Sequence, residues 1–222
     1  MTNLSEQDSP AKVVNAINRH IRLCTQNREG EKYVAVIKKH IVSLKTEIQN
    51  LLDKEEEVDY AYDRVYLYDR LINDEFRKIH NRTKDFDRDN LGKNVRTLVF
   101  SGGKLNPVVV APILDKPQVA HAIIQKISSL GTDHPLFPLA NELNSYIENC
   151  TAAIAQRKAA ESVVNDAKIQ LDIAKVLAIK QYSANYFAAA NDYDENYAEK
   201  LFPVLRKSNK EDKKGNATDT KP

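Results

Sequence analysis

Glycine and proline are scarce in this chain, and tryptophan is absent. Only 6 glycines and 8 prolines occur among its 222 residues, which is about half the usual share of these two residue types. A many-stranded sheet needs both types for its turns, so a mainly β fold is excluded. With 42% hydrophobic and 29% charged residues, the composition is typical of a soluble globular or coiled-coil protein. We therefore expect the bulk of the chain to be helix.

The sequence also lacks an excess of one charge sign and a long apolar run. The 33 basic residues are nearly balanced by 31 acidic ones, so a nucleic-acid partner is not expected. No run approaches the roughly 20 apolar residues of a membrane span, and the N-terminus, MTNLSEQDSPAK, does not resemble a signal peptide. The two cysteines, Cys24 and Cys150, lie far apart in apolar-periodic segments, which favours reduced thiols. These features predict a cytoplasmic protein without a membrane partner.

Two long segments have the heptad periodicity of helices that pack along one another. Residues 31–91 carry apolar side chains in two rows without an internal proline or glycine, which predicts one long helix. A second long helix is predicted at residues 135–192, where alanine occupies many seam positions, the positions that face the partner helix. Large seam residues facing small ones favour an antiparallel pair.

The expected fold class is all-α. We expect an elongated, coiled-coil-like antiparallel helical hairpin with an extra N-terminal helix, which Ser9 can cap and Gly30 can end. Residues 1–206 are predicted to form a single domain, and the charged residues 207–222 a disordered tail. The short helices are predicted at residues 9–30, 115–131 and 194–202.

Residues 95–114 have a different pattern. The short apolar runs VRTLVF and LNPVVVAPIL are separated by SGGK, in which Gly102 and Gly103 can adopt the positive φ of a tight turn. This predicts a small β-hairpin tongue at the turn of the helical hairpin. Pro107 and Pro112 cannot donate to a strand ladder, so the second strand is expected to be a frayed edge.

Two charged residues at seam positions, Asp69 and Arg157, are a candidate ion pair. If Leu91 and Leu139 face each other at the turn, the numbers of facing residues add to about 230, which brings the pair within one helical turn. A catalytic pair is one interpretation. A polar contact that fixes the register is favoured, because no histidine or nucleophile accompanies the pair.

Aromatic and apolar residues provide a candidate contact surface. The segment YAYDRVYLYDR holds four tyrosines, which either bind a partner or pack into a wide core with their hydroxyls at water. A second apolar stripe at residues 169–187 needs a cover, for which the helix at residues 9–30 is the nearest candidate. The candidate contact residues are Tyr60, Tyr66, Tyr68, Val108, Val109, Val110, Tyr193, Tyr197 and Phe202.

No motif for catalysis, a metal or a cofactor was found in the sequence. The five histidines are scattered, and SGGK lacks the length and the Ser or Thr of a phosphate loop. We therefore expect a non-enzymatic helical scaffold or assembly protein whose partner is a protein, with a second copy of the chain as one candidate. The alternative is a membrane-active protein of the pore-forming type, in which the apolar tongue would contact lipid.

Overall fold

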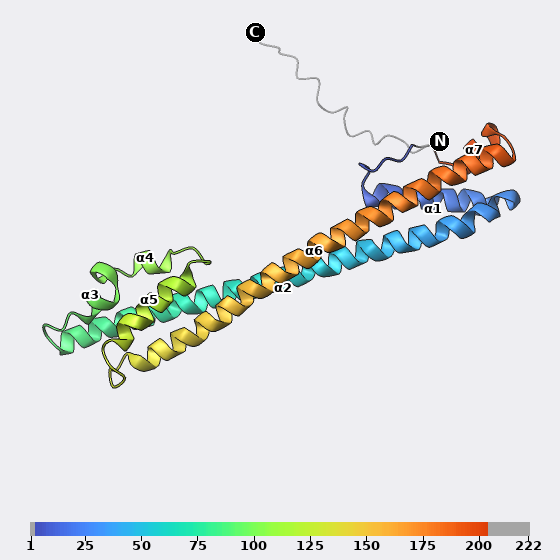
Figure 1. Ribbon diagram of the computed structural model, residues 1–222. Helices are drawn as coiled ribbons and strands as arrows, with labels where there is room; N and C mark the ends of the chain where they lie inside the picture. Colours follow the sequence, from blue (N-terminus) through green and yellow to red (C-terminus); the bar gives the residue numbers. More distant parts are fainter. Residues whose placement is uncertain (1–2, 204–222) are drawn as a thin grey trace, which may run out of the picture. The chain divides into compact units, whose positions relative to one another are not determined.

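The computed structural model describes residues 3–203, and all regular structure in this range is helical. The all-α prediction is confirmed, and α2 and α6 pack along each other in the manner of a helical hairpin (Figure 1). The predicted tail at residues 207–222 lies outside the described residues. The helices are α1 (Pro10–Gln26), η1 (Arg28–Gly30), α2 (Glu31–Asp89), α3 (Val95–Val99), η2 (Ser101–Gly103), α4 (Asn106–Val109), α5 (Lys116–Ser128), α6 (Phe137–Asp192) and α7 (Glu195–Leu201).

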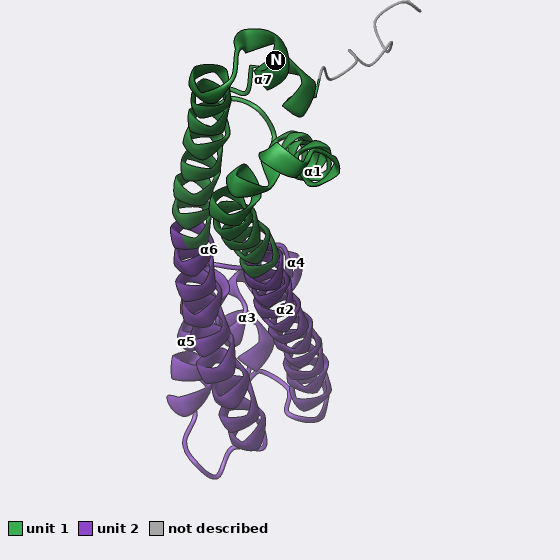
Figure 2. Ribbon diagram, turned by 90° about the vertical axis from the view of Figure 1, so that its right-hand side faces the viewer, with its two compact units in different colours: residues 1–51, 167–222 green, residues 52–166 purple. Residues whose placement is uncertain are grey.

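The chain divides into two compact units (Figure 2). Unit 1 comprises residues 1–51 and 167–222, and unit 2 comprises residues 52–166. Each of the two long helices, α2 and α6, contributes one segment to each unit. Unit 1 also contains α1 and α7, and unit 2 contains α3, α4 and α5.

In unit 1, α1 and α7 pack against the paired segments of α2 and α6. Ser9 caps α1, since its side chain accepts a hydrogen bond from the backbone N–H of Lys12, and Pro10 occupies the first turn. The antiparallel pairing of α2 and α6 shows at Lys32, whose ammonium lies 2.7 Å from the Asp192 carboxylate. The core is an apolar cluster built from α1, α2, α6 and α7 that includes Ile17, Ile37, Leu44, Ala178, Tyr182 and Leu201.

In unit 2, the other segments of α2 and α6 pair in the same antiparallel sense and are packed by α3 and α5. Arg64 donates to the Gln156 side chain at 2.8 Å, and Lys78 lies 2.7 Å from the Glu142 carboxylate. A second apolar cluster fills this unit, and it includes Ile72, Phe76, Ile79, Val99, Phe100, Ile123, Ile127, Leu143 and Ile147.

The predicted β-hairpin tongue is wrong, because residues 95–114 form the short helices α3 and α4 around the 3-10 turn η2. The Asp87 carboxylate accepts hydrogen bonds from the backbone N–H groups of Val95 and Arg96, at 2.6 and 2.9 Å, and so stabilises the start of α3. Pro107 lies in the first turn of α4, where its missing N–H costs nothing. Gly102 does adopt positive φ, but within η2 and not in a hairpin turn.

The register of α2 against α6 differs from the predicted one, so the Asp69–Arg157 pair is also wrong. The facing pairs Arg64–Gln156 and Lys78–Glu142 have numbers that add to 220, ten fewer than the predicted turn implied. Asp69 instead pairs with Lys116 of α5. Arg157 lies 2.8 Å from Glu161, one turn along its own helix.

The second apolar stripe on α6 is not covered by α1, contrary to the sequence prediction. The helix α1 directs Val13 and Ile17 into the first cluster. On α6, Ile169, Ile173 and Phe187 remain exposed. Unit 1 therefore presents an apolar helix face, which we call the α6 stripe: Ile169, Ile173, Leu177 and Phe187.

Candidate functional site

A buried polar cluster lies around His20 in unit 1. The Nδ1–H of His20 donates to the backbone carbonyl of Leu201 at 2.8 Å, which leaves Nε2 to accept from the Asn185 amide at 3.2 Å. The same amide nitrogen of Asn185 donates to the backbone carbonyl of Tyr33 at 3.0 Å. The Phe202 ring stacks on the imidazole with centroids 4.1 Å apart. These contacts tie the end of α7 to α1, α2 and α6.

The electrostatics of this cluster favour neutral side chains. Burial lowers the pKa of His20, although its hydrogen bond to Leu201 opposes the shift. Burial raises the pKa of the nearby Cys24 thiol to about 12, and it also raises the pKa of Tyr182. Because the thiolate is the nucleophilic form of cysteine, Cys24 is inert at neutral pH. The cluster is suited to positioning α7 and not to catalysis.

A buried ion pair joins α5 to α2 in unit 2. Lys116 is only 3% exposed and its ammonium donates to the Asp69 carboxylate, which also accepts a hydrogen bond from Asn73 at 3.2 Å. Burial raises the pKa of the Cys150 thiol, and the neighbouring Asp69 charge adds to the shift. A neutral thiol beside a paired lysine offers no activated nucleophile.

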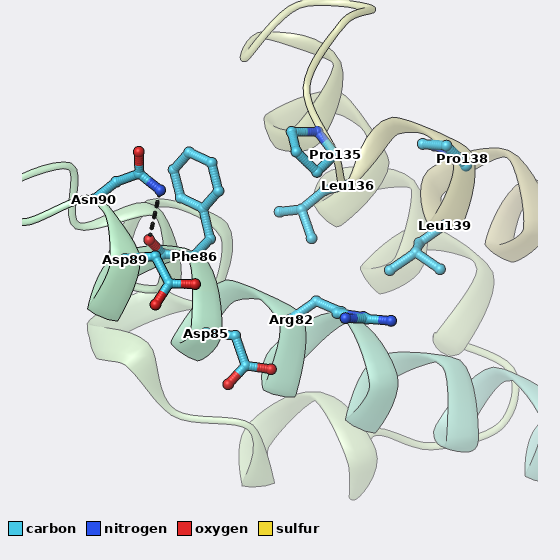
Figure 3. Close-up of a pocket in the computed structure, with 9 residues that line it drawn as sticks. All are labelled: Arg82, Asp85, Phe86, Asp89, Asn90, Pro135, Leu136, Pro138 and Leu139. Carbon is cyan, nitrogen blue, oxygen red and sulfur yellow. Dashed lines mark hydrogen bonds between the residues drawn. The ribbon is translucent and has the colours of Figure 1, made fainter.

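A surface pocket with a volume of about 360 Å³ lies between the end of α2 and the start of α6 (Figure 3). The α2 side presents Arg82, Asp85 and Asp89, and the opposite wall presents Leu136 and Leu139. The two carboxylates are compensated, because Arg88 lies 3.2 Å from each of them. The pocket thus combines an apolar wall with nearly balanced charge and selects no ligand class.

Metal and membrane sites are not supported by the described residues. Within residues 3–203, no three His, Cys, Asp or Glu side chains gather closely enough to hold a metal ion. In the same range, no helix combines the length and the apolar character that crossing a membrane requires.

The tyrosine segment lies on the outside of α2 in unit 2. Tyr60 and Tyr66 are 65% and 55% exposed, and Leu67 is 51% exposed. Val65 and Ile72 face inward, and a helix turns by about 100° per residue, so the side opposite them points to solvent. We call this surface the α2 outer face: Glu56, Asp59, Tyr60, Asp63, Tyr66, Leu67, Arg70, Asp74 and Arg77, all of which are exposed.

The other tyrosines of the segment are partly engaged. Tyr62 is exposed and lies under the Arg157 guanidinium, with 5.0 Å between the Arg157 Cζ and the ring centroid. Tyr68 is half-buried against the second apolar cluster. The core interpretation therefore holds for Tyr68, whereas Tyr60 and Tyr66 are available for contact.

The remaining candidate contact residues do not form one surface. Val108 and Val109 pack partly buried against the second cluster, and Val110 is exposed. The rings of Tyr193 and Tyr197 contact each other with centroids 4.6 Å apart. Phe202 is buried beside His20, so it belongs to the core of unit 1. Sequence reasoning missed the clusters around His20 and Lys116, whose partners lie far apart in the chain.

Comparisons of the chain with protein-family models, with curated proteins and with solved structures gave no match. The exposed aromatic and apolar side chains of the α2 outer face are the feature that points most directly to a function.

Proposed function

We propose that this protein is a helical scaffold or assembly protein of the cytoplasm that acts through protein–protein contacts and catalyses no reaction itself. The observation that carries the proposal is the α2 outer face, where Tyr60, Tyr66 and Leu67 are each more than half exposed. Tyrosine is enriched at protein interfaces, because its ring buries a large apolar area while its hydroxyl stays hydrogen-bonded.

The position of these side chains argues against a role in the fold of unit 2. Residues on the opposite side of α2, such as Val65 and Ile72, supply the contacts to the core. Leaving two phenol rings and a leucine in water forgoes the free energy of burying them, about 1.5–3 kcal/mol for a leucine. Contact with a partner recovers this free energy, so the face is suited to binding.

The α6 stripe supports the same function from unit 1. Ile169, Ile173 and Leu177 follow one another at intervals of four residues, so they form one continuous face. A second helix with an apolar face fits such a stripe. A scaffold needs more than one contact surface, and each unit provides one.

The two buried cysteine thiols support the part of the proposal that the protein catalyses no reaction. The pKa values of Cys24 and Cys150 are both raised by burial, which keeps both thiols protonated. Both thiols are also buried away from solvent and therefore from substrates.

Photo-crosslinking in living cells tests the proposal. A benzophenone amino acid is placed at Tyr60 or Tyr66 in the full chain, with Ser145 as the control position, because Ser145 is exposed on α6 of the same unit. We expect ultraviolet-dependent adducts with protein from positions 60 and 66 and far weaker ones from position 145. Equal yields of adduct at all three positions, or none, would contradict the contact function of the α2 outer face.

A further inference from the structure

The buried imidazole of His20 is held in one protonation state by partners that cannot exchange donor and acceptor roles. The backbone carbonyl of Leu201 can only accept, so Nδ1 carries the proton of this 2.8 Å hydrogen bond. Nε2 lies 3.2 Å from the amide nitrogen of Asn185, which can only donate, so Nε2 carries no proton. The ring is therefore neutral while these contacts are intact.

The amide of Asn185 is itself fixed in orientation. Its nitrogen also donates to the backbone carbonyl of Tyr33 at 3.0 Å, and its oxygen accepts from the Gln181 side chain at 2.9 Å. A flipped amide would place its oxygen against the Tyr33 carbonyl, which has no proton to donate. Protonation of His20 therefore sets an N–H of the ring against an N–H of Asn185.

No acidic group lies beside the ring to stabilise an imidazolium. On α1 the Cys24 thiol lies 3.5 Å from Nδ1, and on α6 the Tyr182 ring contacts the imidazole edge-on. Phe202 covers one face of the ring. Tyr33 of α2 directs its hydroxyl to Asp192, whose charge is already paired at the surface. Within residues 3–203, every group that contacts the imidazole is thus neutral.

We propose that α7 and Phe202 form an acid-released latch, which protonation of His20 opens while α1, α2 and α6 stay folded together. A charged ring needs water, so the proton favours whichever arrangement exposes His20. Phe202 stacks on the imidazole with 4.1 Å between the centroids, and the Leu201 carbonyl lies on Nδ1. Lifting the end of α7 uncovers both places, and the freed side chain can then turn Nε2 from Asn185 to water.

Of the segments around His20, α7 is the one that costs least to displace. It has seven residues, of which Ala198 and Leu201 are buried, and the buried Phe202 follows it. In contrast, α1 extends over 17 residues and buries five of them, among them Val13 and Ile17. Short elements with few buried contacts open locally at a lower free energy than the core does. Release of α7 is therefore the easiest way to expose the ring.

The proton acts on the latch in one direction only. Burial holds the pKa of His20 below its ordinary value of 6.5 in the closed state, and the hydrogen bond to Leu201 opposes this shift without reversing it. The exposed ring of the open state regains the ordinary value. Above pH 6.5 neither state binds the proton, so the latch stays closed. Below pH 6.5 the open state binds it first, and opening gains up to about tenfold per pH unit until the pH reaches the depressed pKa.

An open latch exposes an aromatic surface at this end of unit 1. Phe202 contacts the rings of Tyr182 and Tyr186, with 4.9 and 5.3 Å between the centroids. Tyr182 is fully buried in the closed state. Acid therefore uncovers apolar side chains that neutral pH keeps covered, which goes beyond the contact function proposed for the α2 outer face.

Hydrogen exchange of the purified full chain, followed by mass spectrometry between about pH 4.5 and 7.5, tests the latch. Division by the intrinsic exchange rate at each pH gives a protection factor for residues 195–202 and for α1. We expect the α7 protection factor to fall below pH 6.5, by up to about tenfold per pH unit, while α1 stays far better protected. Equal protection of α7 and α1 at every pH would overturn the latch, because α7 would then open only when unit 1 unfolds.

Two variants remove the switch in different ways, and either one alone is decisive. Asn185→Asp offers the protonated ring an acceptor, so α7 protection should no longer fall with acid and should instead fall as the pH rises. His20→Phe has no titrating ring, so α7 should be less protected than in the wild type but equally so at every pH. His121→Phe, at the exposed histidine of α5, is the matched control and should keep the wild-type pH profile. A wild-type profile in Asn185→Asp or in His20→Phe would overturn the inference.

Discussion

Replacing His20 with phenylalanine should destabilise unit 1 while leaving its apolar packing in place. Phenylalanine has a flat ring of similar size, so the stack on Phe202 persists. Both hydrogen bonds of the imidazole are lost, however. The backbone carbonyl of Leu201 loses its side-chain donor, and one N–H of Asn185 is left buried without an acceptor. Asn185 keeps its bond to the carbonyl of Tyr33.

The expected loss of stability follows from the Leu201 carbonyl and the Asn185 N–H, which both lose a hydrogen-bond partner. A buried donor or acceptor without a partner costs about 1–3 kcal/mol. His20→Phe should therefore lower the free energy of unfolding by about 2–5 kcal/mol, more than most single substitutions do. His121→Phe is the matched control, because His121 is exposed on α5, and it should change the free energy of unfolding by less than about 0.5 kcal/mol.

Urea denaturation followed by far-ultraviolet circular dichroism measures the free energy of unfolding of both variants. Hydrogen exchange should also show faster exchange of the α7 amides in His20→Phe, since the imidazole holds the end of this helix. A loss below about 0.5 kcal/mol, with α7 protected as in the wild type, would refute the positioning role of His20.

The difference in the free energy of unfolding between the wild type and His20→Phe should depend on pH. Burial depresses the folded-state pKa of His20 below its ordinary value of 6.5. Below pH 6.5 the unfolded chain therefore binds a proton that the folded chain does not, and the wild type loses stability as the pH falls through the depressed pKa. His20→Phe should lack this contribution, so the difference in the free energy of unfolding between the two proteins should shrink as the pH falls. A constant difference would show that His20 does not titrate in the unfolding reaction.

Four further predictions test the packing by denaturation of purified variants. Lys116→Met should cost about 3–5 kcal/mol by leaving Asp69 without its partner, and adding Asp69→Leu should recover much of that loss. Arg157→Ala should cost only about 1 kcal/mol, because its ion pair lies at the surface; a larger loss would favour the register predicted from the sequence. Tyr182→Phe should raise the free energy of unfolding by about 1 kcal/mol, because the buried hydroxyl has no hydrogen-bond partner within the described residues; a loss of stability would reveal one. Gly30→Ala should cost about 1–3 kcal/mol, since the added Cβ would lie 2.8 Å from a backbone oxygen of α1; an unchanged stability would show that the turn can relax.

Local sequence signals determined the helices of this protein. Heptad periodicity predicted helices at residues 31–91 and 135–192, and the structure has α2 at Glu31–Asp89 and α6 at Phe137–Asp192. Ser9 and Asp194 cap α1 and α7 with their side chains. These features depend on residues within a few turns of one another, so they are readable without a fold.

The segment at residues 95–114 shows where local signals stop being sufficient. Short apolar runs around a glycine pair are compatible with strands and with short helices. The Asp87 carboxylate stabilises a helix here, because it accepts hydrogen bonds from two backbone N–H groups at the start of α3. Val99 and Phe100 are then buried in a helical cluster, which offers no strand partner.

The register and the sites were decided by the tertiary structure. A heptad pattern repeats every seven residues, so it identifies the face of a helix that packs but not which residue meets which. The position of the turn decides that, and here α3, η2 and α4 stand in place of the predicted strand pair. Asp69 therefore meets Lys116, and His20 meets Leu201 across 181 positions of sequence. Such contacts form only when distant segments are brought together, whereas the exposed tyrosines of the α2 outer face lie along one helix and need the fold only to show that this side is exposed.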